Sequence, residues 1–267
     1  MFFGVAGLFG KWIDLPPALI TWSRCAFAFV ALFLMILFSK ERFALKQTRH
    51  YFVFAGLGLL YALHWWAFFY SIQISTVAIG LLSFSTFPVF TVFLEPFFFR
   101  ERIRKTDIVS ALAVFGGIAL IVPGFNLNNA ITLGAAVGVL SGLSFAVLQI
   151  FNRKYIQTYS GIQITFYQTG SAAIILLPLV SFGSSCVTST DIFLLMLLGV
   201  LCTAVAHTLF ISGFKSVKVR TASIIAGLEP VYGIIAAMLL LHEIPSLKVI
   251  CGGIVILAVS MWVSVSN

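Results

Sequence analysis

The fold is decided by two stretches of sequence, VAIGLLSFSTFPVFTVFLEPFFF at residues 77–99 and ASIIAGLEPVYGIIAAMLLL at residues 222–241. Each is an almost uninterrupted apolar run of the length that a helix needs to cross a bilayer, about 20 residues. Each also contains an internal proline, Pro88 or Pro230, and the two prolines are 142 residues apart. The pair indicates a membrane protein whose second half repeats its first.

The composition agrees with a membrane protein. Hydrophobic residues make up 61% of the 267-residue chain and charged residues only 9%, and the mean hydropathy is +1.10. A soluble domain contains about 45–50% apolar and about 25% charged residues. A fold of this length cannot bury so much apolar surface within itself, so much of that surface must face lipid. The composition therefore excludes a soluble enzyme, a nucleic-acid-binding protein and a disordered chain.

Outward from these two stretches, the whole chain divides into apolar runs separated by short polar loops. This pattern predicts one all-α membrane domain of ten transmembrane helices. The first run is too short to cross a bilayer, so we expect that the chain begins inside its first helix or that its natural start lies upstream. The runs are Phe2–Ile13, Pro17–Phe38, Tyr51–Ser71, Val77–Phe99, Thr106–Val122, Leu133–Ile150, Ile162–Phe182, Ile192–Phe214, Ala222–Leu241 and Leu247–Val265.

The basic residues predict the orientation in the membrane. The loops after the second, fourth, sixth and eighth runs hold 13 of the 16 lysine and arginine residues, whereas only Lys11 and Lys248 lie on the opposite side. Cytoplasmic loops carry such an excess of positive charge. We therefore expect a multi-pass protein of the bacterial inner (cytoplasmic) membrane with both termini in the cytoplasm. The net charge of +8 then reflects attraction to an anionic leaflet and implies no nucleic acid.

The two halves, residues 1–125 and 126–267, each hold five of the predicted spans. Because five is odd, the halves must point in opposite directions across the membrane. Inverted repeats are typical of transporters that alternate access around a site near the midplane. The pairs related by an offset of 142 are Lys11 and Arg153, Pro88 and Pro230, and Glu101 and Glu243.

Several different short motifs occur one after another along nearly the whole chain. They are Phe3-Gly4 with Lys11, Leu15-Pro16-Pro17, Trp22-Ser23-Arg24, Ser144-Phe145-Ala146, Leu228-Glu229-Pro230-Val231, and His242-Glu243 before Gly252-Gly253. This set resembles the EamA branch of the drug/metabolite transporter superfamily. The resemblance implies a ten-helix fold, a central cavity open to one side at a time, and carriage of small metabolites, often amino acids outward. The sequence departs from the pattern by lacking the first half-turns of helix one and by having Phe87-Pro88 where the second half has Glu229-Pro230.

Two charged residues inside the predicted spans are candidates for the substrate site, because a charge near the bilayer centre costs at least about 2.5–3.5 kcal/mol on insertion scales. Glu229 lies seven residues into its run and precedes Pro230, which removes a backbone hydrogen bond. It can hold a proton or a cationic substrate group, or it can pair structurally with Arg24 or a neighbouring helix. Arg24 either snorkels to the outer surface or clamps a substrate carboxylate with its two-pronged guanidinium.

A stripe of aromatic residues and a histidine is predicted on one face of the third span. Because a histidine is unfavourable against lipid, we expect the stripe to line the cavity and to offer apolar walls and cation–π surface to an amine or aromatic substrate. The alternative is a set of lipid-facing aromatic residues near the interface. The stripe consists of Tyr61, His64, Trp65 and Phe68, with Trp66 and Tyr70 beside it, and the further candidates are His207, Tyr167 and Gln168.

The leading interpretation is a secondary transporter, not an enzyme, that moves an amino acid or a related amine-bearing compound by alternating access. The alternative is uptake or exchange of a cationic nucleoside-like metabolite such as an S-adenosyl compound, which Glu229 and the stripe would suit. A carrier of phosphorylated compounds is disfavoured because only Arg24 and Lys11 could bind the phosphate. A membrane-embedded enzyme would need paired aspartates or a placed Ser–His pair, and a channel would need a ring of like polar residues.

We expect no cofactor and no metal, because Cys25, Cys186, Cys202 and Cys251 lack ligand spacing. The expected partners are a small-molecule substrate and the lipid bilayer, with proton or cation coupling possible, and the expected assembly is a monomer or a homodimer.

Three groups of residues are interpreted as structural. Lys11 and Asp14 are expected to pair at the outer mouth. Glu101 and Glu243 lie in loops as repeat mates. The glycines on one face of the sixth span, and the glycine pairs of the closing helices, are expected to allow close helix packing. These glycines are Gly134, Gly138, Gly142, Gly116-Gly117 and Gly252-Gly253.

Overall fold

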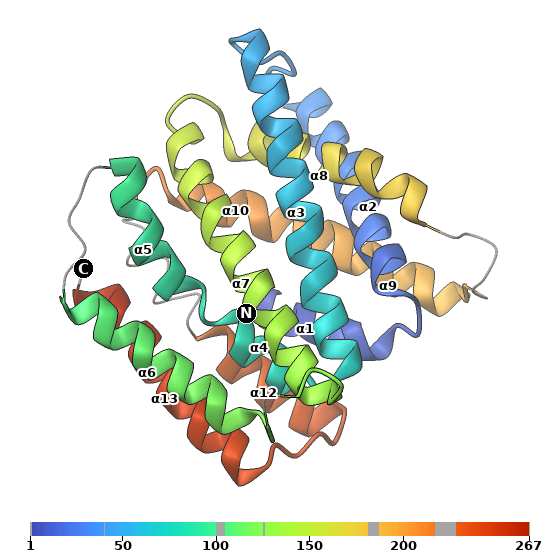
Figure 1. The fold of residues 1–267 in the computed structure, drawn as a ribbon. Coiled ribbons are helices and arrows are strands. Elements are labelled where there is room, and N and C mark those ends of the chain that lie inside the picture. The colour runs from blue at the N-terminus through green and yellow to red at the C-terminus, as the bar shows by residue number, and fades with distance from the viewer. Residues whose placement is uncertain are drawn as a thin grey trace.

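The computed structural model describes residues 2–39, 41–99, 105–124, 126–180, 187–216 and 228–266, and these residues form helices and no strand. Figure 1 shows the helices as a bundle in which α3 runs through the middle. The elements are α1 (Phe2–Trp12), α2 (Pro17–Phe38), α3 (Thr48–Ile74), α4 (Val77–Phe84), α5 (Phe87–Phe99), α6 (Lys105–Ile121), α7 (Ala130–Tyr155), α8 (Gly161–Leu176), the 3-10 turn η1 (Leu177–Leu179), α9 (Ser189–Gly199), the π-helix η2 (Val200–Val205), α10 (Ala206–Gly213), α12 (Glu229–Leu240) and α13 (Leu247–Ser266).

Six helical segments in the described part of the chain are long and apolar enough to cross a membrane. They are Pro17–Phe38, Thr48–Ile74, Val77–Leu94, Ala130–Tyr155, Gly161–Leu179 and Ser189–Gly213. Shorter apolar helices cover Ile108–Ile121, Glu229–Leu240 and Leu247–Trp262. The predicted all-helical membrane fold is confirmed, whereas the ten spans and the inverted repeat remain predictions.

Polar residues begin several of the helices. The side chain of Ser160 accepts a hydrogen bond from the backbone N–H of Gln163, and the Gln163 side chain accepts one from the Ser160 N–H, which forms a capping box at α8. Thr188 begins α9 in the same way with Asp191. Asn129 caps α7 by accepting from two backbone N–H groups. Because the first N–H groups of a helix have no partner within it, these side chains fix where the helices start.

Proline divides the expected span Val77–Phe99 into α4 and α5. Pro88 has no N–H to bond back to the preceding turn. The chain turns at Ser85 and Thr86 instead, where Thr86 Oγ1 donates to the Ser83 carbonyl at 2.8 Å and the Val89 N–H bonds to the Thr86 carbonyl at 3.1 Å. The repeat-related Pro230 sits in the first turn of α12. Residues 222–227, where the predicted ninth span begins, lie outside the described residues.

Helix α3 packs against both α7 and α8, and α2 packs against α8 and α9. At one edge of the bundle α6 and α13 lie side by side, as Figure 1 shows in green and red. A Cβ on Gly252 would lie 2.7 Å from the Gly117 carbonyl oxygen, so these two backbones touch. On α7, a Cβ on Gly142 would lie 2.7 Å from the Phe84 carbonyl oxygen. The prediction of close packing at these glycines is confirmed, but Gly116 meets nothing within 4 Å.

Hydrogen bonds connect loops at each of the two ends of the helix bundle. At one end, the loop before α3 binds the loop before α8, because the Lys46 N–H donates to Tyr159 Oη at 3.1 Å. At the other end, Lys11 Nζ donates to the carbonyls of Gln73 at 3.3 Å and Ser75 at 2.9 Å. The expected pairing of Lys11 with Asp14 is therefore wrong: the lysine instead satisfies backbone carbonyls at the end of α3, which the helix leaves without intrahelical partners.

Large apolar side chains cover much of the outer surface. Phe38, Phe52, Leu239 and Ile174 are each at least 70% exposed. Soluble monomers rarely expose extended apolar surface of this kind. The bundle therefore presents this surface to lipid and keeps its polar residues inside or at the two ends.

Candidate functional site

Arg24 lies at the centre of the candidate site. It is completely buried, so the alternative in which it snorkels to the outer surface is wrong. Its Nε and Nη2 donate to Thr203 Oγ1 at 2.9 and 2.7 Å. The guanidinium carbon lies 3.4 Å from the centroid of the Trp65 ring, a close cation–π contact. Its third nitrogen, Nη1, has no hydrogen-bond partner among the described residues.

Thr203 holds Arg24 from a π-helical segment. Within η2, Thr203 Oγ1 also donates to the Leu198 carbonyl at 2.9 Å, five residues back. A π-helical turn widens the helix locally and leaves backbone carbonyls without their usual partners, and such turns occur often at functional sites. Here the widened turn places a hydroxyl where it can accept both guanidinium N–H groups.

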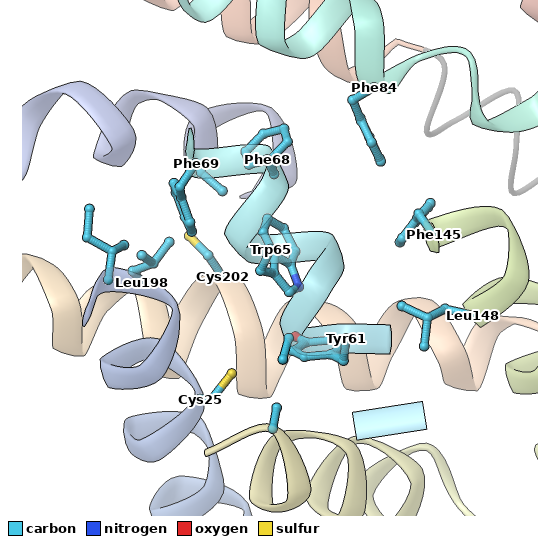
Figure 2. Packing of buried hydrophobic residues seen from close by; sticks show 14 of the residues in the cluster. Cys25, Tyr61, Trp65, Phe68, Phe69, Phe84, Phe145, Leu148, Leu198 and Cys202 are labelled. Carbon is cyan, nitrogen blue, oxygen red and sulfur yellow. The ribbon is translucent and has the colours of Figure 1, made fainter. Parts of the chain in front are cut away.

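The aromatic stripe of α3 faces the interior of the bundle, where Arg24 also lies. Tyr61, His64, Trp65 and Phe68 are each 3% exposed or less, so these residues do not face lipid. Figure 2 shows Tyr61, Trp65 and Phe68 one after another along α3, with Phe84 and Phe145 opposite, and neighbouring rings of the three meet edge to face. The His64 ring lies 4.9 Å from Phe145 and 4.6 Å from Trp65 between centroids.

His207 joins the stripe from α10. Its ring centroid lies 5.3 Å from that of Tyr61 and 5.6 Å from that of Trp65. We call the assembly of Arg24, Tyr61, His64, Trp65, Phe68 and His207 the central cluster. It brings together side chains from α2, α3 and α10, and Thr203 of η2 supports it.

His64 is fixed by Ser141 of α7. Its Nδ1 lies 2.9 Å from Ser141 Oγ and 3.0 Å from the Ser141 carbonyl oxygen, and the hydroxyl also reaches the His64 carbonyl at 3.0 Å. The Nε2 of His64 has no hydrogen-bond partner among the described residues. Buried polar atoms without partners cost about 1–3 kcal/mol each, so this nitrogen and Arg24 Nη1 are available to a ligand.

Glu229 lies in the first turn of α12 and is 8% exposed. Its backbone is pressed against α1, because a Cβ on Gly4 would lie 2.8 Å from the Glu229 carbonyl oxygen. Arg24 donates hydrogen bonds to Thr203 rather than to Glu229, yet the charges of Arg24 and Glu229 are near enough to attract each other. The cluster thus has a buried cation, with a carboxyl group within electrostatic range but not bonded to it.

Four of the predicted site residues are not members of the central cluster. Trp66 and Tyr70 are half-buried and stack on each other with centroids 5.3 Å apart. Tyr167 donates to the Phe43 carbonyl at 2.7 Å near the loop before α3. Gln168 is buried and donates to Asn152 Oδ1 at 2.7 Å.

Sequence reasoning missed Thr203 and Ser141, which hold Arg24 and His64. A signal for Thr203 was present, because Thr203 and His207 are four residues apart within an apolar run and this spacing favours one side of a helix. Ser141 gave no such signal, because its contact with His64 depends on how α7 crosses α3.

The geometry is that of a closed, membrane-buried polar site, and the sequence matches a model of the EamA-like transporter family over residues 1–122 and 132–265. The chain belongs to the EamA-like transporter family. This EamA-like transporter is 28% identical to an uncharacterized transporter of Bacillus subtilis over 87% of its own length and 76% of that protein. It is 27% identical to a protein named S-adenosylmethionine uptake transporter of Rickettsia conorii, over 84% of its own length and 74% of that protein.

The fold of this EamA-like transporter also occurs in a known crystal structure. The TM-score is 0.70 with 17% sequence identity, and the match covers 97% of this chain and 91% of the other. At that identity the likeness shows the shared fold alone. Family membership establishes a membrane transporter.

Proposed function

We propose that the chain is a secondary transporter of the inner membrane that carries a cationic nucleoside-like metabolite, such as an S-adenosyl compound, by alternating access. The proposal includes ten spans in two inverted halves, residues 1–125 and 126–267. The six long apolar segments and three shorter ones support it. The grouping of the loops at two ends of the bundle supports a location of all the basic loops on one side of the membrane. We place that side, and both termini, in the cytoplasm.

The observation that carries the substrate proposal is the buried Arg24 with its unpartnered Nη1 against the face of Trp65. An arginine offers a planar, two-pronged set of donors that fits a carboxylate. The aromatic rings of Tyr61, Trp65 and Phe68 offer flat surfaces on which a purine can stack. An S-adenosyl amino acid carries a carboxylate, a purine and positive charge in one molecule.

Glu229 is the residue that we assign to the positively charged part of the substrate. Its buried carboxyl group can balance a sulfonium or ammonium group, which neither Arg24 nor the aromatic rings can do alone. The names of the Rickettsia relatives favour this substrate class over a simple amino acid, which was the leading expectation from the sequence. We therefore rank the S-adenosyl class first and keep free amino acids as competitors in the test.

The test is uptake of labelled S-adenosylmethionine into proteoliposomes, with protein-free liposomes as blank and with S-adenosylhomocysteine, adenosine, methionine and other amino acids as competitors. We expect uptake that S-adenosyl compounds inhibit more strongly than methionine does. Arg24→Lys should raise KM at least about tenfold, because a lost hydrogen bond to a charged group costs about 1.5–3 kcal/mol. Arg42→Lys, at an exposed position, is the matched control and should leave KM unchanged. Absence of uptake, or uptake of free amino acids alone, would refute the assignment.

A further inference from the structure

A second group of polar side chains is buried next to the central cluster. Gln149 and Asn152 come from α7 and Gln168 from α8, and they are 4%, 3% and 1% exposed. We call these three residues the amide cluster. They are amides without formal charge, and they lie on the two helices, α7 and α8, that both pack against α3.

The amide cluster adjoins the Tyr61 end of the central cluster. A Cβ on Gly58 would lie 3.1 Å from the backbone carbonyl oxygen of Gln168, and Gly58 is about one helical turn before Tyr61 on α3. Gln149 lies three residues before Asn152 on α7, and this spacing places both side chains on the same side of that helix. The amide cluster therefore meets α3 about one turn from Tyr61, the first aromatic residue of the central cluster.

Two hydrogen-bond acceptors of the amide cluster are unused. Gln168 Nε2 donates to Asn152 Oδ1 at 2.7 Å, which satisfies one edge of each amide. Gln149 Oε1 and Gln168 Oε1 have no hydrogen-bond partner among the described residues. A buried acceptor without a donor is unfavourable, so two such acceptors favour a ligand that brings N–H groups.

We propose that Gln149, Asn152 and Gln168 form a subsite that accepts hydrogen bonds from a neutral amino group on a heteroaromatic ring, such as the exocyclic amine of adenine. An amine of this kind has two N–H donors, one for each free carbonyl oxygen. The cluster has no carboxylate to balance a cation, so a neutral donor fits it better than an ammonium group. The inference rests on the proposed function, because it takes the substrate to carry such a ring.

The same geometry predicts discrimination. If the amine is replaced by a carbonyl oxygen, as in a hypoxanthine ring, the ligand brings a hydrogen-bond acceptor to the two side-chain oxygens of Gln149 and Gln168, which are acceptors themselves. A site built to bond a donor rejects the analogue that lacks it, because its own polar groups are left unpaired. We expect at least a tenfold preference for the adenosyl over the inosyl form of the same compound.

The test compares S-adenosylmethionine with its S-inosyl analogue as inhibitors of labelled uptake, and adenosine with inosine as thermal stabilisers of the purified protein. The wild-type protein should be inhibited at a concentration at least tenfold lower by the adenosyl form and stabilised more by adenosine. Gln149→Met and Gln168→Met, which keep volume but remove the acceptor, should reduce both preferences. Thr169→Val is the control, because Thr169 bonds only within α8 in the described contacts, and it should keep them.

The outcomes separate this inference from the function on which it rests. If no S-adenosyl compound is carried but adenosine still stabilises the protein more than inosine, the proposed function fails and the subsite stands. If adenosine and inosine stabilise it equally, or not at all, the subsite is refuted even when S-adenosylmethionine is carried. An unchanged preference in both glutamine variants, with normal elution on gel filtration, would likewise refute it.

Discussion

Arg24 is held by two partners that stabilise it without neutralising it. Thr203 accepts its N–H groups and Trp65 covers its face. A positive charge inside a membrane bundle is unfavourable, and both contacts reduce that cost. Because neither partner carries a negative charge, an incoming carboxylate can bind Arg24 more strongly than either does. The arrangement is therefore suited to a carboxylate that binds at Nη1, which has no hydrogen-bond partner among the described residues.

Removing the Thr203 hydroxyl should destabilise the folded protein. Thr203→Val keeps the shape but leaves two guanidinium donors unpaired, which we expect to cost about 1–3 kcal/mol. Thr208→Val is the matched control, because Thr208 Oγ1 has no hydrogen-bond partner among the described residues and its loss should cost little. Thermal unfolding in detergent measures both variants. Equal unfolding temperatures for the two would contradict the role given to Thr203.

The neighbouring tryptophans of α3 should differ in their importance for transport. Trp65→Ala should reduce uptake strongly, because it removes the ring beneath Arg24, whereas Trp66→Ala should leave uptake nearly intact, because Trp66 stacks on Tyr70 apart from the central cluster. Trp65→Phe keeps an aromatic ring if the alanine variant does not fold. Uptake rates normalised to protein in the membrane provide the measurement. Normal uptake by Trp65→Ala would remove the stripe from the site.

Glu229 should couple transport to a proton or a cation. Glu229→Gln keeps the shape and removes the charge, so it should abolish net gradient-driven uptake while affecting substrate exchange much less. Loss of both activities would indicate direct substrate binding instead. Unchanged net uptake together with unchanged substrate affinity would make Glu229 a structural residue. Counterflow and gradient-driven uptake in the same proteoliposomes distinguish these cases.

The sequence predicted part of this arrangement. The spacing of Tyr61, His64 and Trp65 placed them on one face, and the structure has all three buried. The position of Arg24 within a span indicated that its charge needs a stabilising partner, but not that this partner is Thr203. That contact depends on how α2 crosses η2, 179 residues later in the chain, and no local pattern encodes such a crossing.

At the scale of elements, Glu243 ties two helices together. Its Oε2 accepts a hydrogen bond from the Val77 N–H at 2.9 Å, so the loop between α12 and α13 caps the start of α4. The preceding His242 has a φ of 55°, a left-handed conformation that is uncommon outside glycine and turns the chain sharply there. The structural role expected for Glu243 is confirmed, while its repeat mate Glu101 lies outside the described residues.

Loss of this cap should lower stability in two steps. Glu243→Gln keeps an acceptor oxygen but loses the favourable charge near a helix start, worth about 0.3–1 kcal/mol. Glu243→Ala loses the hydrogen bond as well and should cost about 1 kcal/mol or more. The unfolding temperatures should therefore fall in the order wild type, Gln, Ala, and Glu41→Ala should match wild type. An alanine variant as stable as the wild type would show that the cap contributes nothing.

Helix boundaries were predicted better than helix irregularities. The runs from Pro17 to Phe38 and from Leu247 onward match α2 and α13 at their starts. The π-helix η2 was not predicted, because an apolar run has the same composition whether each carbonyl bonds four or five residues ahead. The break between α4 and α5 had a visible cause in Pro88, although hydropathy alone joins them.

At the scale of the whole molecule, the two ends of the bundle should differ in their access to reagents. In a background without the native cysteines, Asn128→Cys should react with an impermeant maleimide on intact cells, whereas Lys46→Cys should react only after the membrane is opened. Both positions are exposed at the surface, so accessibility reports sidedness rather than burial. The opposite pattern would reverse the proposed orientation.

Cys25 and Cys202 lie beside the central cluster, as Figure 2 shows, and both are free and buried. Cys202 directly precedes Thr203, the residue that holds Arg24. The transporter therefore carries a native chemical reporter of its own working cycle. After Cys25, Cys186 and Cys251 are replaced by serine or alanine, a small thiol reagent can modify Cys202 only when the interior opens. The rate of modification then measures how often the protein opens, and protection by a bound compound identifies that compound as a ligand even when it is never carried across.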